Sequence, residues 1–149
     1  MLAKIALADE PTTALDATVQ IQILLLLRQL QRELGMSIIF VTHDVGVATE
    51  IADELAVMYA GKIVEIGDVA DVIKKPAHPY TQGLLSSTVN SESKGKRLEV
   101  IGGSPPDMSK LFKGCAFSPR CKKVLDQCWH QKPAPESLST NQIASCFNI

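Results

Sequence analysis

Two adjacent carboxylates close a short apolar run near the start of the sequence. The run is Ile5–Ala8, the carboxylates are Asp9 and Glu10, and Pro11 ends the pattern. A strand that ends in an acidic pair suits a metal-bound phosphate, because one carboxylate can bind a Mg²⁺ water while the other orients or deprotonates an attacking water. If the strand continued through them, the two side chains would point to opposite sides. On these residues alone, a polar strand exit is the simpler interpretation.

A histidine, His43, follows the next predicted strand along the chain. Ligands of open α/β sheets bind outside the carboxyl ends of the strands, so His43 is expected beside Asp9 and Glu10, within hydrogen-bonding reach of a phosphate. The alternative is a histidine without chemistry in a strand-to-helix loop. The three residues at one sheet edge leave these two interpretations about even.

The elements that must position these residues alternate between strand and helix. Apolar runs predict buried strands at 4–8 and 37–42, and a helical repeat fills 17–34 between Asp16 as N-cap and Gly35 as the C-terminal stop. The wide apolar stripe of that helix predicts that it is covered on more than one side. Strand, crossover helix and strand imply an α/β fold with a parallel sheet and flanking helices.

The pattern continues to about residue 87 and then changes. Asp44 can cap a second helix, and Asp68 a third. A polar stretch at 88–97 loses the apolar rhythm and predicts a linker. The further elements predicted are a helix at about 45–53, a β-hairpin of 54–59 and 62–67, helices at 68–74 and 80–87, and a strand at 98–101.

Composition limits the class of protein. The 149 residues are 46% hydrophobic with a mean hydropathy of +0.11, which suits a folded core. The net charge of −1 and pI of about 6.3 give no basic surplus for a nucleic-acid partner. No apolar run reaches the roughly 18–20 residues of a membrane span, and the amino-terminal residues lack a signal-peptide layout. The expected compartment is the cytoplasm, where cysteines are thiols or ligands rather than disulfides.

Four cysteines gather in the tail with the spacing C-x5-C-x6-C-x17-C and without a CxxC pair. They suit an iron–sulfur cluster or a structural Zn²⁺, which would also staple a tail poor in apolar residues. His130 is a substitute ligand or a surface histidine. Arg120, Lys122 and Lys123 are candidates for offsetting thiolate charge, with simple solvation as the alternative. The four cysteines are Cys115, Cys121, Cys128 and Cys146.

The segment ALADEPTTALD, then a helix, then IIFVTHD resembles the ATPase subunit of ABC transporters, a P-loop NTPase with a RecA-like sheet. The resemblance makes the acidic pair the end of the Walker B strand, TALD the D-loop and the histidine of VTHD the switch histidine. It implies that Asp9 holds Mg²⁺ through water, Glu10 polarises the attacking water and His43 contacts the γ-phosphate of ATP. Asp16 would reach across an ATPase dimer interface as well as cap its helix.

The segment VMYAGKIVEIGDVADVIKKPAHPYTQGLL looks like the oligopeptide and dipeptide importer branch of that family, with HPYT as a characteristic element. His78 is expected to begin a helix after a turn, with no chemistry of its own. GCAFSPRC and the later cysteines resemble the carboxyl-terminal extension of these ATPases, where a matching set binds a 4Fe–4S cluster. The resemblance therefore favours a cluster over zinc. It implies an ATPase part at 1–87, a linker at 88–97 and a Cys-rich extension at 98–149.

The sequence has no GxxxxGK[ST] loop, LSGGQ-like signature or recognisable Q-loop, all of which precede the acidic strand in that family. The resemblance thus covers only the carboxyl-terminal half of such a subunit, and the isolated chain is expected neither to bind ATP tightly nor to hydrolyse it. The implied partners are membrane-spanning permease subunits, a second ATPase subunit and, indirectly, an extracytoplasmic solute-binding protein, at the inner face of the membrane.

Two functions are compatible with these features. The first is part of an ATPase that drives import of di- or oligopeptides, although nickel and other solutes use related ATPases. The second is a catalytically inactive fragment that serves as a metal-stabilised interaction or regulatory module. A Cys-rich nucleic-acid-binding module is a weak third, because the sequence has no excess of basic residues.

Overall fold

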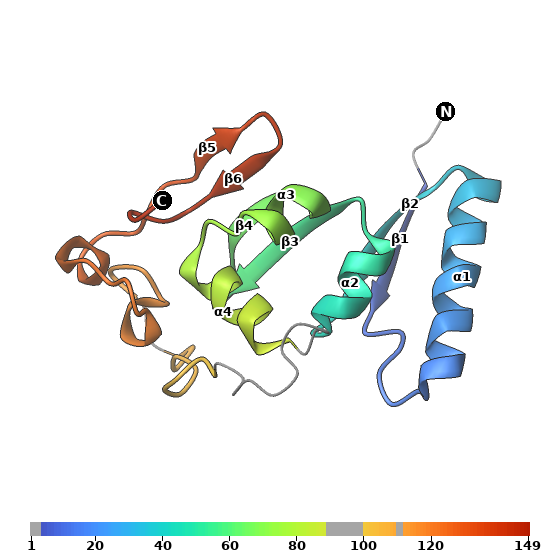
Figure 1. The fold of residues 1–149 in the computed structure, drawn as a ribbon, viewed down its shortest axis with the longest axis horizontal. Helices are drawn as coiled ribbons and strands as arrows, with labels where there is room; N and C mark the ends of the chain where they lie inside the picture. Colours follow the sequence, from blue (N-terminus) through green and yellow to red (C-terminus); the bar gives the residue numbers. More distant parts are fainter. Residues whose placement is uncertain (1–3, 89–99, 110–111) are drawn as a thin grey trace. The chain divides into compact units, whose positions relative to one another are not determined.

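The computed structural model describes residues 4–88, 100–109 and 112–149 (Figure 1). The chain divides into two compact units, residues 1–52 and 53–149. Both mix helices with strands, which confirms the predicted α/β class at this level. Within the described residues, no helix is long and apolar enough to cross a membrane.

The first unit is built on two parallel strands. β1 (Ile5–Asp9) pairs in register with β2 (Ser37–Val41) from end to end. α1 (Ala17–Leu34) connects them and runs alongside the strands in Figure 1, and α2 (Val45–Ile51) follows β2. The predicted strand, crossover helix and parallel strand are therefore confirmed for this unit.

Local signals set the ends of both helices in this unit. The Asp16 carboxylate accepts the backbone N–H groups of Thr18 and Val19, each at 3.0 Å, and so caps α1 as predicted. Gly35 ends α1 in the left-handed region with φ of 57°, where a residue without Cβ is favoured. Asp44 caps α2 through the N–H of its third residue at 3.2 Å.

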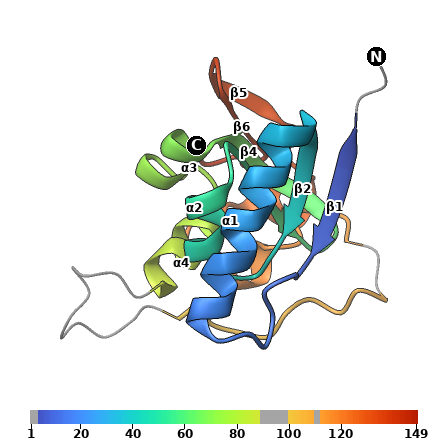
Figure 2. The same cartoon turned by 90° about the vertical axis from the view of Figure 1, so that its right-hand side faces the viewer.

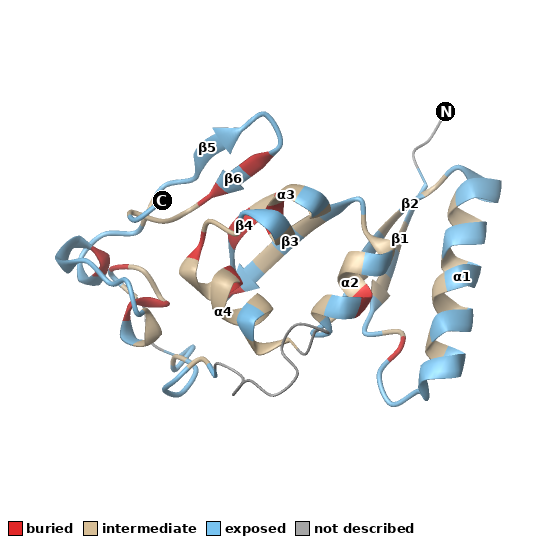
Figure 3. Ribbon diagram, viewed as in Figure 1, coloured by how far each residue is buried: buried red, intermediate tan, exposed pale blue. Residues whose placement is uncertain are grey.

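The prediction of fully buried strands is wrong for this unit. Ile5, Leu7 and Ile39 are 65%, 69% and 55% exposed, whereas the alternate residues of the two strands are half-buried (Figure 3). Successive side chains of a strand point to opposite faces, and the described chain covers one face only. α1 likewise has no buried residue, so the expectation that it is covered on more than one side is also wrong.

The second unit holds a four-stranded antiparallel sheet, seen from two directions in Figures 1 and 2. The order is β3 (Glu54–Tyr59), β4 (Lys62–Asp68), β6 (Gln142–Ala144) and β5 (Glu136–Ser139). The hairpin of β3 and β4 confirms the prediction. The β5–β6 hairpin was not predicted, and it joins the tail to the same sheet as β4.

Two helices follow β4. α3 (Val69–Lys74) packs against β3 and β4, and α4 (Pro79–Ser87) begins at a proline. Asp68 occupies the N-cap position of α3 but makes no capping hydrogen bond, because its carboxylate instead accepts from Asn141 Nδ2 at 2.7 Å.

The segment after α4 is only partly described. Of the linker predicted at 88–97, residues 89–97 lie outside the described residues, as do 98 and 99 of the predicted strand at 98–101. Val100 and Ile101 are not in a strand. Between this segment and the last hairpin, the regular structure that the described residues show is two 3₁₀ turns, Ser118–Arg120 and Asp126–Trp129.

An aromatic cluster forms the core of the second unit. Tyr59 and Phe117 are buried, and their ring centroids are 5.1 Å apart. The ring centroids of Tyr80 and Tyr59 are 4.6 Å apart. The guanidinium of Arg120 donates to the carbonyl oxygens of Ile101 and Gly102 and to the Tyr59 hydroxyl. These contacts join the tail to the β3–β4 hairpin, and they direct Arg120 to oxygen acceptors rather than to the predicted thiolates.

A buried carboxylate connects three segments of this unit. Glu65 on β4 is 1% exposed and accepts the backbone N–H groups of Ala77 and His78, each at 2.9 Å. It also accepts from Nε2 of Gln142 on β6 at 2.8 Å, and the same amide donates to the Lys75 carbonyl at 2.9 Å. A buried charge is tolerated only when its oxygens are satisfied, as they are here.

Replacing Glu65 by Gln should therefore destabilise the second unit by about 2–4 kcal/mol, because an amide NH₂ would face donors and leave buried polar groups unpaired. Urea unfolding of the full chain measures this. The matched control is Glu54→Gln on the neighbouring strand, whose exposed side chain should change the unfolding free energy by less than about 0.5 kcal/mol. Equal effects of the two substitutions would contradict the role given to Glu65.

Candidate functional site

The first candidate site lies where β1 and β2 end. Asp9 and Val41 are register partners at the ends of the two parallel strands, and the N–H of Glu10 donates to the Val41 carbonyl at 2.9 Å. Glu10 and His43 follow directly in the two loops. The parallel register therefore brings the predicted residues to one edge of the pair, as the sequence indicated.

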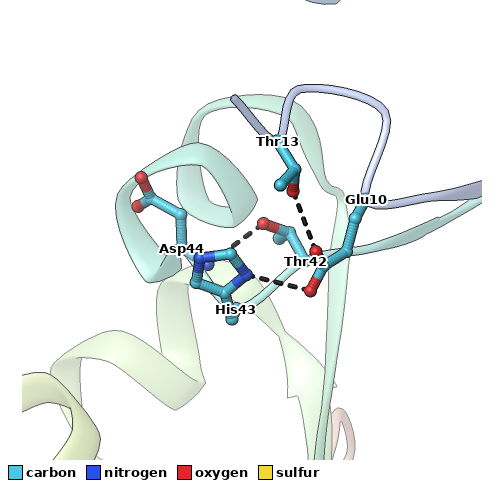
Figure 4. Close-up of polar contacts among 5 residues, drawn as sticks. All are labelled: Glu10, Thr13, Thr42, His43 and Asp44. Atoms are coloured by element: carbon cyan, nitrogen blue, oxygen red, sulfur yellow. Dashed lines mark hydrogen bonds and ion pairs between the residues drawn. The ribbon is translucent and has the colours of Figure 1, made fainter. Parts of the chain in front are cut away.

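Glu10 and His43 are in direct contact (Figure 4). Nδ1 of His43 donates to Oε1 of Glu10 at 2.9 Å, and the hydroxyl of Thr13 donates to Oε2 at 2.8 Å. Both carboxylate oxygens are thus held in place. His43 itself sits in a turn fixed by the N–H of Asp44, which donates to the Thr42 hydroxyl at 3.0 Å.

The backbone at Glu10 is unusual. Its φ of 45° lies in the left-handed region, where a residue with a Cβ is disfavoured by roughly 1–2 kcal/mol. β1 ends at Asp9, so the simple alternation that would send Asp9 and Glu10 to opposite sides does not extend to Glu10. The turn is closed by the N–H of Thr13, which donates to the Glu10 carbonyl at 3.1 Å. This turn aims the carboxylate at His43.

The pair is open to solvent. The side chains of His43 and Glu10 are 75% and 44% exposed. The hydrogen bond from His43, and then that from Thr13, lowers the pKa of Glu10 below its ordinary value, so this carboxylate stays ionised at neutral pH. Thr13 was missed from the sequence, although its position three residues after Glu10 in a turn was a usable signal.

The other two predicted residues lie nearby in the chain and have different surroundings. Asp9 is exposed at the last position of β1. Asp16 is engaged as the N-cap of α1. The structure thus joins Glu10 with His43 and leaves the metal and dimer roles of Asp9 and Asp16 as predictions.

A second candidate site is a cavity in the second unit, lined by all four cysteines. Phe117 and Phe147 give it an apolar wall, and Lys123 also lines it. His78 lines the same cavity, although the sequence assigned it no chemistry; the predicted substitute ligand His130 is not among the lining residues. Residues separated by more than 60 positions thus meet at one place.

The surroundings of the thiols in this cavity are largely apolar. Burial is the main cause of the raised pKa of Cys115, Cys121 and Cys146. For Cys121 the backbone N–H of Lys123 lowers the pKa in part, and the neighbouring cysteines raise it further. Lys123 acts in the opposite direction on the pKa of Cys146. The four thiols thus share one largely apolar cavity.

Backbone N–H groups already point at the sulfur atoms. The N–H of Lys123 donates to Sγ of Cys121 at 3.4 Å, and that of Asn148 to Sγ of Cys146 at 3.3 Å. Sγ of Cys128 accepts from a backbone N–H at 3.4 Å. Such donors stabilise thiolates in metal centres. No group of three or more Cys, His, Asp or Glu side chains in the described residues is already gathered as a ligand set, however.

Comparison with known proteins shows which proteins this chain is similar to. Residues 64–128 match the family described as "Oligopeptide/dipeptide transporter, C-terminal region". The chain is 45% identical over 144 residues to the oligopeptide transport ATP-binding protein OppD of Salmonella typhimurium. The aligned region covers 97% of this chain and 43% of OppD. Residues 64–128 thus resemble the C-terminal region of that family, and nearly the whole chain is similar to part of a peptide-transport ATP-binding protein.

Two further relatives show a similar match. AppD of Bacillus subtilis, an oligopeptide transport ATP-binding protein, is 43% identical over 97% of the chain and 44% of its own length. DppD of the same organism, a dipeptide transport ATP-binding protein, is 44% identical over 96% of the chain and 43% of its own length. The chain thus spans less than half the length of these ATP-binding proteins. The matched family region contains His78 and three of the cavity cysteines, Cys115, Cys121 and Cys128.

Removing the imidazole in His43→Ala should raise the pKa of Glu10 toward the ordinary value for Glu, because its hydrogen bond is the largest cause of the lowering. Thr13→Val should raise that pKa by less. ¹³C NMR titration of the Glu10 carboxyl carbon measures both. The hydrogen bond to the carboxylate and its contribution to stability exist while Glu10 is ionised, and they are lost as the pH falls through the lowered pKa of Glu10.

The control for this titration is Thr49→Val in the same unit, whose hydroxyl donates to the Gly46 carbonyl and does not touch Glu10. It should leave the Glu10 titration unchanged. A Glu10 pKa that is the same in wild type and His43→Ala would contradict the contact.

Proposed function

We propose that this chain supplies the hydrolytic side of an ATP-binding subunit that couples ATP hydrolysis to import of di- or oligopeptides. The observation that carries the proposal is the hydrogen bond between Glu10 and His43 at the carboxyl ends of two parallel strands. The similarity to these relatives supports it, because they are named as peptide-transport ATP-binding proteins. Residues 1–87 would belong to a RecA-like ATPase domain, and 98–149 to a Cys-rich extension.

Each residue at the strand ends has a distinct part in this proposal. Glu10, ionised and held at both oxygens, would orient and polarise the attacking water. Asp9, exposed at the end of β1, would hold Mg²⁺ through a water, and bound Mg²⁺ would neutralise charge on the phosphates. Asp16 would reach a second ATPase subunit while still capping α1.

The contact with Glu10 sets a requirement for His43. A carboxylate can only accept, so the Nδ1 atom of His43 carries a proton. For His43 also to donate through Nε2 to a γ-phosphate oxygen, the ring must carry both protons and be an imidazolium. A doubly protonated ring could thus contact the phosphate and Glu10 at the same time.

The partners follow from the proposed role. Membrane-spanning permease subunits would receive the conformational change, a second ATPase subunit would complete the hydrolytic interface, and an extracytoplasmic solute-binding protein would act indirectly through the permease. The subunit would then lie at the cytoplasmic face of the membrane. Peptides are the proposed cargo because the relatives are named for oligopeptide and dipeptide transport.

A chimera tests the hydrolytic role. The matching part of the Salmonella typhimurium relative is replaced by this chain, and Mg²⁺-dependent ATP turnover and peptide uptake are measured with its permease. We expect activity in the chimera and a loss of about 10²-fold or more in turnover for Glu10→Gln, with ATP binding retained. The isolated chain should show no turnover, since it lacks a GxxxxGK[ST] loop.

The matched control is Glu33→Gln on α1, which removes a carboxylate that accepts from Gln29 of the same helix. This variant should keep the turnover of the chimera. A chimera whose turnover survives Glu10→Gln would refute the role. Turnover by the isolated chain that depends on Glu10 would refute only the expected inactivity of that chain.

We further propose that the four cysteines bind a metal centre, a 4Fe–4S cluster in preference to Zn²⁺. The supporting observation is that they line one cavity whose sulfur atoms already accept backbone N–H groups. Four thiols and an apolar wall fit either group, and binding would draw the sulfur atoms into a ligand set that the described side chains do not yet form. The centre would fasten the tail to the sheet.

Anaerobic purification tests the centre. The full chain should be brown, with broad visible absorption and iron and sulfide in stoichiometric amounts, and each Cys→Ser substitution should lower the iron content. Ser137→Ala, on β5 and outside the cavity lining, should keep it. A colourless protein with one zinc per chain would establish the zinc alternative, and four free thiols without metal would refute both.

The second candidate function is a metal-stabilised interaction or regulatory module without catalysis. The pairing of β6 with β4 favours it to this extent: the tail and the β3–β4 hairpin share one sheet, so the second unit has a core of its own. A chimera that binds its permease but has no turnover would select this function over the hydrolytic one.

A further inference from the structure

His78 is the buried histidine of the second unit, and its backbone is fixed on both sides. It is 1% exposed, its N–H donates to the Glu65 carboxylate at 2.9 Å, and Pro79 begins α4 immediately after it. Its ring packs 5.8 Å from the ring of Phe117, between centroids. A ring so enclosed has little freedom to turn.

One ring nitrogen is committed to the helix. The N–H of Tyr80 donates to Nδ1 of His78 at 3.0 Å, so the side chain caps α4. Nδ1 must therefore carry a lone pair. In the neutral imidazole the proton is then on Nε2, which makes that atom a donor. Burial, opposed by Glu65, lowers the pKa of His78 to about 4, so the ring is neutral at physiological pH.

The second ring nitrogen has a donor to offer and no acceptor within the described part of the chain. The hydrogen bonds of the His78 ring there end at Nδ1. Yet the residue lines the cavity that the four cysteines share. Sulfur atoms are the acceptors that this cavity supplies in quantity, and a thiolate is a better acceptor than a thiol.

We propose that His78 donates a hydrogen bond from Nε2–H to a sulfur atom of the metal centre held in this cavity, as a positioning residue outside the ligand set. The proposal rests on the metal centre proposed above and adds a residue from the turn before α4. Hydrogen bonds to metal-bound sulfur stabilise its negative charge and raise metal affinity, and their loss costs about 10–100-fold in affinity. His78 would thus link the centre to α4 and, through its backbone, to Glu65.

Two substitutions separate the two ring nitrogens. His78→Asn places a carbonyl oxygen near the Nδ1 position and can still cap α4, but it has no donor at the Nε2 position. His78→Gln carries an amide N–H near the Nε2 position and loses the cap. If the proposal is right, metal binding and stability respond to these variants in opposite ways.

The probe is Co²⁺ added anaerobically to the metal-free full chain, followed by its thiolate-to-cobalt absorption and by competition with a chelator. Wild type and His78→Gln should bind Co²⁺ with similar affinity and similar band energy. His78→Asn should bind about 10-fold or more weakly with a shifted band. Urea unfolding of the metal-free chains should rank His78→Asn close to wild type and His78→Gln below it.

Other outcomes overturn the proposal in distinguishable ways. If wild type binds Co²⁺ and His78→Asn binds it equally well with the same band, His78 is a helix cap and nothing more. If both variants lose affinity equally, the loss follows from a ligand role or from the fold. If wild type neither binds Co²⁺ with thiolate absorption nor contains metal after anaerobic purification, the metal centre itself is refuted, and with it the role of His78.

Discussion

The second unit depends on the hydrogen bonds that the buried Glu65 carboxylate accepts. Burying an unpaired charge costs several kcal/mol, so the chain must bring donors to it. They come from two segments, the turn at 77–78 and Gln142 on β6. Because Cys146 follows β6 closely, the same carboxylate that fixes the backbone of His78 also sets where the last cysteine can lie. The hydrogen bonds of Glu65 on β4 thus position two of the segments that line the cavity.

The first unit depends instead on register. Parallel pairing without a shift places the residues after β1 and β2 side by side, and the contact between Glu10 and His43 follows. A polar contact between exposed side chains contributes little to stability. The left-handed backbone of Glu10 costs at least as much. The pair is therefore poorly explained as a stabilising device, and its exposure and fixed aim suit a group that meets a ligand.

The sequence predicted what local physics determines. Asp16 and Gly35 bound α1 as expected, because capping and the left-handed stop are decided within a few residues. Burial of Leu7 was predicted wrongly, because an apolar pattern shows that a face suits burial and not which atoms cover it. The β5–β6 hairpin escaped prediction for two reasons. Glu136–Ser139 is mostly polar, and the hairpin joins the sheet through the pairing of β6 with β4, which is far away in sequence.

The candidate sites divide along the same line. Asp9, Glu10 and His43 were found because strand ends concentrate chemistry at a sheet edge, whereas Thr13 and His78 depend on tertiary detail. A histidine before a proline reads as a turn, and only its burial against Phe117 and its place in the cavity give it another meaning.

Charge explains why a neutral histidine suits that position. A centre of four thiolates in an apolar cavity needs its negative charge spread, and backbone N–H groups and Lys123 contribute to this already. A second cation in the interior would itself need solvation, which the burial of His78 denies. A neutral ring whose Nδ1 is occupied by a helix N–H supplies a directed donor without that cost. In the proposed arrangement, the capping bond that begins α4 would therefore also leave Nε2–H as the hydrogen available to the sulfur atoms.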